Sequence, residues 1–156
     1  MKEQTCCFTG HRQIPLAQRA RVAVALEARV RELIAQGFCY FGAGGALGFD
    51  TMAAETVLRL REEYPAIRLI LVLPCADQSA RWAQEDVLLY EEIKQKADKC
   101  VCLAPHYYNG CMQARNRRLV DESAACICYM TDEKSGTGYT VRYAQKSGLA
   151  VYNVAK

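Results

Sequence analysis

The sequence predicts an α/β fold, a single Rossmann-like three-layer domain over residues 1–156, with a mostly parallel sheet and helices on both faces. Two observations predict it. Short apolar runs alternate with longer amphipathic stretches along the whole chain, and the apolar runs are nearly free of polar residues. Strands of that kind are covered on both faces, as in parallel sheets flanked by helices.

Length and composition bound the class of protein. The chain has 156 residues, of which 51% are hydrophobic and 24% charged, the usage of a globular domain able to bury a core. A net charge of +3 indicates neither a nucleic acid nor a membrane surface as partner. No apolar run approaches the roughly 18 residues of a membrane span, and the N-terminus lacks the apolar region of a signal peptide. We therefore expect a cytoplasmic protein outside the membrane, with its nine cysteines mostly reduced.

The first half of the chain predicts three strands and two helices. The expected strands are residues 5–9, 38–41 and 67–73. The first helix follows Pro15 and repeats apolar residues at the helical period, at Val22, Leu26, Val30 and Leu33. Gly37 is expected just beyond its end. Asp50 is expected as the N-cap of the second helix, which Pro65 ends because proline lacks an amide hydrogen.

The second half continues the alternation. A long helix is expected over residues 79–96, with Trp82, Val87, Tyr90 and Ile93 inward. Further strands are expected at 100–103, 125–130 and 150–154, and helices at 112–123 and 137–146, with Gly148 ending the last one. The chain is thus five β-α units and a final strand. Ligands on such sheets bind beyond the carboxyl ends of the strands, so the loops there are the candidate sites.

The glycine cluster from Gly42 to Gly48 is the strongest signal in these loops. Four of the ten glycines fall within seven residues, between a strand and a helix. Glycine allows positive φ and close approach of a ligand, and the free amides of a helix start favour an anion. The spacing matches neither the dinucleotide fingerprint nor a P-loop. The alternative is a tight turn without a ligand.

Three other loops offer groups for the same anion. Arg12 follows the first strand and suits a phosphate contact, while His11 is either a general base or a solvated side chain. Arg115 and Asn116 lie near the start of the helix after the fourth strand; the neighbouring Arg117 and Arg118 are interpreted as a solvated face. The turn after the fifth strand, with Gly136 and Thr137, is a second candidate anion cradle.

The remaining candidates are an aromatic residue and the cysteines. Trp82, the only tryptophan, either stacks on a base or fills the core. Two Cys-x-Cys pairs, at 100/102 and 126/128, could be read as zinc thiolates, but both fall in predicted central strands, where thiols pack as small apolar groups. We therefore expect no metal site. Cys75 and Cys111 fall in predicted loops and are the expected reactive thiols.

These motifs together resemble the YpsA-like family of the SLOG superfamily, named for the DNA-processing and Lonely Guy proteins. The resemblance rests on Thr9-Gly10-His11-Arg12, the stretch from Gly44 to Asp50, Leu73-Pro74 and the later Arg115-Asn116 and Gly136-Thr137. It covers almost the whole chain and implies a Rossmann-like fold that binds a nucleotide or nucleotide-derived ligand. The candidate ligand-binding residues are Gly10, His11, Arg12, Gly44, Gly45, Ala46, Gly48, Asp50, Gln78, Trp82, Arg115, Asn116, Gly136, Thr137 and Thr140.

One departure from the superfamily separates two functional hypotheses. Lonely Guy enzymes use an Arg, which Arg115 resembles, and a Glu, whose position is held here by Thr140. The first hypothesis is therefore a sensor or partner-binding module for a nucleotide or an ADP-ribose-like ligand. The alternative is a phosphoribohydrolase-like enzyme that cleaves an N-glycosidic or phosphate-linked bond, with Asp50 or Glu55 as acid/base and Arg115 as anchor. The resemblance also implies a homodimer. A single-strand nucleic-acid module is disfavoured because no basic, aromatic-rich stripe is present.

Overall fold

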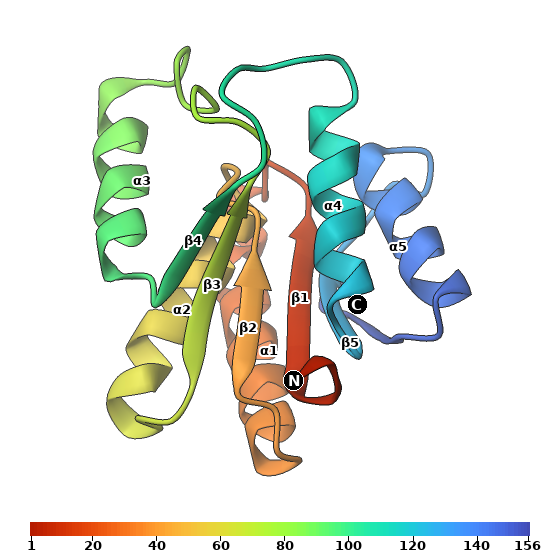
Figure 1. The fold of residues 1–156 in the computed structure, drawn as a ribbon. Helices are drawn as coiled ribbons and strands as arrows, with labels where there is room; N and C mark the ends of the chain where they lie inside the picture. The colour runs from red at the N-terminus through yellow and green to blue at the C-terminus, as the bar shows by residue number, and fades with distance from the viewer.

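Six parallel strands form one sheet in the order β4-β3-β2-β1-β5-β6 in the computed structural model, which describes residues 1–156 (Figure 1). The strands are β1 Thr5–Gly10, β2 Tyr40–Ala43, β3 Arg68–Leu73, β4 Lys99–Cys102, β5 Ala125–Tyr129 and β6 Ala150–Asn153. The helices are α1 Leu16–Ala35, α2 Phe49–Glu63, α3 Gln84–Lys96, α4 Cys111–Asp121 and α5 Gly136–Lys146, preceded by a 3-10 turn, Lys2–Gln4. The predicted Rossmann-like α/β fold is confirmed.

Two apolar cores, one on each face of the sheet, give the three layers. The larger core joins the sheet to α1, α2 and α3, and the smaller joins it to α4 and α5 (Figure 1). The four apolar positions predicted to face inward on α1 are all buried, at Val22, Leu26, Val30 and Leu33. None of the helices combines the length and the apolar character that a bilayer crossing requires.

The end of α1 shows how local sequence sets an element boundary. Gly37 has φ +101°, and its amide donates to Ile34 O at 3.0 Å. The next amide, of Phe38, donates to Leu33 O at 2.9 Å, which completes a Schellman cap. Because the cap uses the Phe38 amide, β2 begins at Tyr40, opposite Thr5, and the predicted start at residue 38 is two residues early. The strand also extends two residues beyond its predicted end, through Gly42 and Ala43.

The predicted helix over residues 79–96 is wrong in its first turn. The helix begins at Gln84, and the segment before it forms turns, with Ala80 N donating to Asp77 O at 3.1 Å and Trp82 N to Ser79 O at 3.1 Å. Trp82 therefore lies in the loop that leaves β3. Its helical spacing to Tyr90 and Ile93 reflects packing against the same core and not a continuous helix.

The strand order reverses at β1, which pairs with β2 on one side and with β5 on the other. The chain leaves β1 toward α1 on one face and leaves β5 toward α5 on the opposite face (Figure 1). The two loops diverge at the carboxyl edge and leave a crevice between them, the place where open α/β sheets bind ligands.

Candidate functional site

A pocket of about 260 Å³ lies in this crevice, at the carboxyl ends of β1 and β5. Its walls come from the loops after β1, β2 and β5 and from the start of α4, so residues distant in sequence meet there. The lining residues are Thr9, Gly10, His11, Arg12, Ala46, Asp50, Met112, Arg115, Asn116, Ser135, Gly136 and Thr137. Nine of these are sequence-predicted candidates, and we call this space the anion pocket.

Arg115 is the buried cation of the anion pocket. It lies on the first turns of α4, exposes 4% of its surface and donates through its guanidinium to Gly44 O. A second nitrogen, Nε, donates to Asn116 Oδ1 at 2.8 Å. Burial lowers the pKa of Arg115 below its ordinary value, and the nearby charge of Asp50 opposes this shift. The guanidinium is thus held rigidly, with its charge inside the protein.

The sequence predicts Asp50 as the N-cap of α2, and this prediction is wrong, because Asp50 is the second residue of the helix. The N-cap position is taken by Gly48, whose φ of +78° glycine adopts without strain. The Asp50 carboxylate accepts a hydrogen bond from Ala46 N at 3.3 Å. Burial raises the pKa of Asp50 above its ordinary value, and the Arg115 charge opposes that rise. The start of α2 therefore already faces a carboxylate of the chain itself.

The glycines of the first turn make room for protein atoms. A Cβ at Gly44 would lie 2.4 Å from a guanidinium nitrogen of Arg115, and a Cβ at Gly48 would lie 2.1 Å from Arg12 O. At Gly45 the Cβ would lie 2.8 Å from the Leu73 side chain. Gly10, after β1, similarly admits the Phe49 ring, 2.5 Å from where its Cβ would be. These residues shape the pocket by allowing close packing behind it.

The second turn, at the start of α5, is open at Gly136, although a Cβ at Gly138 would lie 2.1 Å from Glu133 O. Ser135 caps the helix by accepting a hydrogen bond from Gly138 N at 3.1 Å, while the amides of Gly136 and Thr137 have no partner within the protein. A Cβ at Gly136 would meet no atom within 4 Å. The first turn of α5 holds no acidic residue. The positive end of this helix is thus available to an anion in the pocket.

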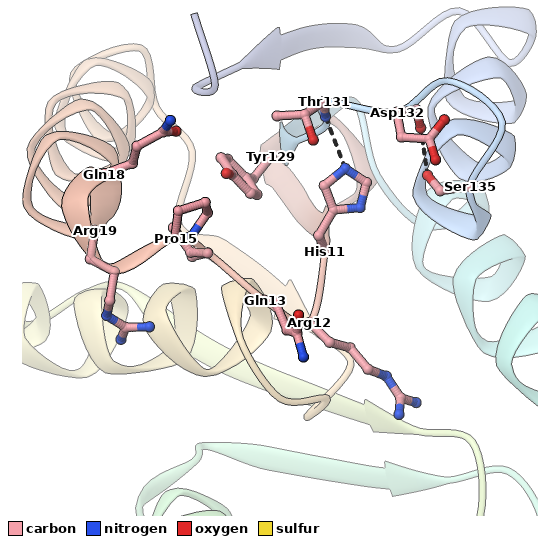
Figure 2. Close-up of a pocket in the computed structure, with 11 residues that line it drawn as sticks. His11, Arg12, Gln13, Pro15, Gln18, Arg19, Tyr129, Thr131, Asp132 and Ser135 are labelled. Carbon is pink, nitrogen blue, oxygen red and sulfur yellow. Dashed lines mark hydrogen bonds between the residues drawn. The ribbon is translucent and has the colours of Figure 1, made fainter.

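Arg12 and His11 lie at the mouth of the anion pocket. Arg12 is exposed and lines both this pocket and the two larger ones beside it. His11 is half-buried, and its Nε2 accepts a hydrogen bond from Thr131 N at 2.8 Å (Figure 2). Its ring lies edge-on to Tyr129, with 5.6 Å between the ring centroids. His11 therefore ties the β1 and β5 loops together, and the lone pair that a general base would use is occupied.

Two larger pockets flank the anion pocket. One, of about 860 Å³, opens over the start of α1 and is lined mainly by polar side chains such as Gln13, Gln18, Arg19 and Asp132 (Figure 2). The other, of about 740 Å³, is lined by Arg12, Asp77, Gln78, Ala80, Arg81, Trp82, Tyr107 and Met112. Trp82 is half-buried, and its ring lies edge-on to the Tyr90 ring, with 5.0 Å between the ring centroids. Trp82 therefore both packs on the core and lines this pocket.

Five predicted residues line none of these three pockets: Gly44, Gly45, Gly48, Thr140 and Glu55. Thr140 is buried within α5, where its hydroxyl donates to Gly136 O at 3.2 Å. Glu55 is exposed on α2, in a groove toward α3 that also contains Arg59 and Leu89. Of the two candidate carboxylates, only Asp50 lines the anion pocket.

The sequence interpretation of the cysteines is wrong in two respects. Cys100 and Cys102 are exposed, because β4 is an edge strand and not a central one, and three strands separate them from Cys126 and Cys128. Cys75 and Cys111, expected to be reactive, are buried, and Cys111 is the first residue of α4. Burial raises the pKa of Cys75 to about 12, which disfavours its thiolate.

Two residues that line the anion pocket, Met112 and Ser135, were not predicted from the sequence. Met112 lies between Arg115 and the pocket of Trp82, and one guanidinium nitrogen lies 3.7 Å from its sulfur. Ser135 caps α5, and its hydroxyl donates to Asp132 O at 2.6 Å (Figure 2). A serine close before a helix is an N-cap signal, so Ser135, two residues ahead of the predicted helix start at residue 137, could have been found.

Comparison with known proteins gives one consistent assignment. The model of the family described as the YspA SLOG family, YpsA, matches residues 6–153. A UPF0398 protein of Bacillus velezensis is 28% identical over 137 residues, which cover 83% of this chain and 75% of that protein. A UPF0398 protein of Oceanobacillus iheyensis is 32% identical over 118 residues, covering 74% and 64%. The uncharacterized SPbeta prophage-derived protein YoqJ of Bacillus subtilis is 29% identical, covering 80% of each chain.

Two solved structures share the fold. DNA processing protein A from Helicobacter pylori, described with a single-stranded DNA binding mode, superposes with a TM-score of 0.64 at 24% identity. The same protein from Streptococcus pneumoniae superposes with a TM-score of 0.68 at 17% identity. Each match covers 96% of this chain, which spans only 64% and 50% of the two larger chains.

Proposed function

This chain belongs to the YpsA family of SLOG proteins, and from that premise we propose that it binds a nucleotide or nucleotide-derived small molecule at the carboxyl edge of its sheet. In this proposal it acts as a sensor or a partner-binding module. The observation that carries the proposal is the anion pocket, which buried Arg115, exposed Arg12 and the residues with unpartnered amides, Gly136 and Thr137, line together. Guanidinium groups and helix-start amides are the usual partners of a phosphate.

The charges of the pocket support a phosphate over a neutral ligand. Arg12 and Arg115 contribute two positive charges against the single carboxyl of Asp50. Burial raises the pKa of that carboxyl, so the pocket favours its neutral form over its negatively charged form. A ligand anion that meets both arginines would compensate the charge that Arg115 buries.

Isothermal titration calorimetry with AMP and ADP-ribose as probes tests this proposal. Replacing Arg12 by Ala removes an exposed side chain, so the fold should be kept while the affinity falls about tenfold to a hundredfold, the loss of a charge-assisted hydrogen bond. Arg117→Ala is the matched control. It also removes one arginine, but from a position on α4 that does not line the pocket, so the affinity should stay unchanged. Binding of neither probe, or equal loss in both variants, would overturn the proposal.

Hydrolysis of the ligand is a second candidate, favoured by one observation. The Asp50 carboxyl lines the anion pocket beside Arg115, and a raised pKa is what a general acid needs near neutral pH. Incubation with radiolabelled AMP would then release the free base, and Asp50→Asn would abolish the release while AMP still binds. Binding without base release in the wild-type protein favours the sensor.

The proposal also covers where the protein is located, its oligomeric state and its relation to DNA. We propose a cytoplasmic homodimer; all nine cysteines are free thiols, as a reducing compartment would keep them. Sedimentation velocity measures the oligomeric state. DNA binding, which is described for the Helicobacter pylori protein, is not proposed for this chain. A gel shift with single-stranded DNA and a steep dependence on salt would speak against that choice.

A further inference from the structure

The pocket that contains Trp82 adjoins the anion pocket directly. The two share Arg12 and Met112 as walls, and we call the larger one the aromatic pocket. They also share one hydrogen-bond acceptor, because Gly44 O receives both the Arg115 guanidinium and Gln78 Nε2, the latter at 3.4 Å. The side chains of Gln78 in the aromatic pocket and Arg115 in the anion pocket are therefore held in position relative to each other.

Size separates the roles of the pockets. The anion pocket, about 260 Å³, is smaller than the roughly 300 Å³ at which sites for whole small molecules begin. It suits a phosphate with part of a sugar, so the base of a nucleotide must lie in a neighbouring pocket. The aromatic pocket, about 740 Å³, has room for a base and offers the Trp82 and Tyr107 rings, whereas the pocket toward α1 is mainly polar. Bases bind to proteins by stacking on such rings.

Gln78 gives the aromatic pocket a chemical preference. The side chain is 8% exposed and lines the pocket. Its Nε2 donates to Gly44 O and to the Tyr90 hydroxyl at 3.2 Å, while its Oε1 accepts no hydrogen bond. The two amide atoms cannot exchange places, because Oε1 would then face the acceptor Gly44 O. Oε1 is buried in this conformation, and rotation about the terminal torsion, which is soft in glutamine, is the movement that would bring it to the pocket.

We propose that the aromatic pocket is a base subsite that selects a base with an exocyclic amino group. The base stacks on Trp82 and donates one amino hydrogen to Gln78 Oε1, the acceptor that lacks a partner in the protein. A base with a carbonyl at the same position would place a second acceptor against Oε1. This inference rests on the proposed function, since it assumes that the phosphate occupies the anion pocket.

AMP and IMP test the preference, because they differ at the group that meets Gln78. Calorimetry should show AMP bound at least about tenfold more tightly than IMP by the wild-type protein, the effect of an unmet polar group. Gln78→Met keeps the length of the side chain but removes the acceptor, and should bring the two affinities within about twofold. Gln13→Met changes a glutamine of the polar pocket and should keep the wild-type ratio. Equal affinities for AMP and IMP in the wild-type protein would overturn the inference, whatever the variants do.

Fluorescence of Trp82, the only tryptophan, reports occupation of the subsite itself. AMP should change its emission, whereas ribose 5-phosphate should bind in calorimetry without that change, because it lacks the base. Binding of ribose 5-phosphate and AMP with equal affinity and no change in emission would refute the base subsite and leave the anion pocket standing. Binding of neither compound would refute the proposed function and this inference together.

Discussion

Two glycine-rich turns, after β2 and after β5, lie at the same edge of the sheet and lead into helices, yet they differ in what surrounds them. In the first turn, the space beside Gly44 and Gly48 is filled by Arg115 and by the backbone of Arg12. In the second turn, the space beside Gly136 is empty and borders the anion pocket. The sequence shows two similar anion cradles. The structure shows a first turn that is packed at Gly44 and Gly48, and a second turn that is packed at Gly138 but open at Gly136.

The helices that follow these turns differ in the same sense. The start of α2 carries Asp50, whose carboxylate already accepts the amide of Ala46. The start of α5 carries no acidic residue and leaves the amides of Gly136 and Thr137 unpartnered. An anionic ligand is therefore expected at α5, whose first turn holds no acidic residue and whose first amides are free. A glycine loop before a helix indicates an anion site only where the helix start is free.

Among the substitutions that test the difference between the two turns, Gly48→Ala should have the largest effect, a loss of stability. Its Cβ would lie 2.1 Å from Arg12 O, and its φ is +78°. We expect the free energy of unfolding to fall by about 3 kcal/mol or more, because the backbone must move as well as adopt a strained conformation. Urea denaturation measures this free energy of unfolding.

Gly148→Ala is the control for that variant. Gly148 has a similar φ of +86° but no atom within 4 Å of its Cβ position. The free energy of unfolding of this variant should fall only by the cost of the left-handed conformation, about 1–2 kcal/mol. Equal losses in the two variants would mean that the close approach of Arg12 is unimportant and that the first turn is less packed than described.

Substitution of Gly136 by Ala should affect binding and not stability. The new methyl group meets no protein atom, so the free energy of unfolding should change by less than about 0.5 kcal/mol. The methyl group would occupy the anion pocket, and the affinity for AMP should fall by about tenfold or more, the loss of at least one hydrogen bond to phosphate. Calorimetry and urea denaturation on the same sample separate the two effects. Unchanged affinity would show that ligands do not approach α5.

Substitution of Asp50 by Asn should have the smallest effect, visible as a change in pH dependence. The pKa of Asp50 is raised in the folded protein above the ordinary value of 3.8, so the folded state binds the proton more tightly than the unfolded state. Its contribution to stability is therefore fully present below the ordinary pKa and is lost as the pH rises through the folded pKa. Asparagine does not titrate, so the variant should gain stability relative to wild type as the pH rises.

Urea denaturation from about pH 4 to pH 7 measures this gain. The difference in unfolding free energy, variant minus wild type, should increase with pH and then level off. A difference that decreases with pH would mean that the Arg115 charge outweighs burial and that the ionised carboxylate is the favoured form. The start of α2 would then resemble a conventional ion pair.

The sequence predicts the elements better than it predicts their environment. The helical period of Val22, Leu26, Val30 and Leu33 and the stop at Gly37 are local features, and all are confirmed. The same reasoning extends α3 backward to residue 79, because Trp82 contacts the core from a turn. Apolar spacing records which residues face the core, and a turn can place a residue there as well as a helix can.

The sequence predicts most of the residues that line the anion pocket, but not the role of each. Arg12, Asp50, Arg115, Gly136 and Thr137 follow from the rule that the carboxyl ends of parallel strands share one edge. That Glu55 lies away from the pocket depends on the direction in which α2 presents each side chain. That Cys100 and Cys102 are exposed depends on β4 being the edge strand, which no local pattern encodes.

The sequence by itself determined the fold class, the order of strands and helices and the group of loops that carry the site, because apolar periodicity and helix caps act between near neighbours in the chain. The tertiary structure alone decided which glycine leaves space for a ligand, which carboxylate faces Arg115 and which cysteines are buried. These properties depend on atoms brought together from distant segments. The Cβ position of Gly44 is filled by a residue 71 positions further along the chain, and that of Gly136 by none.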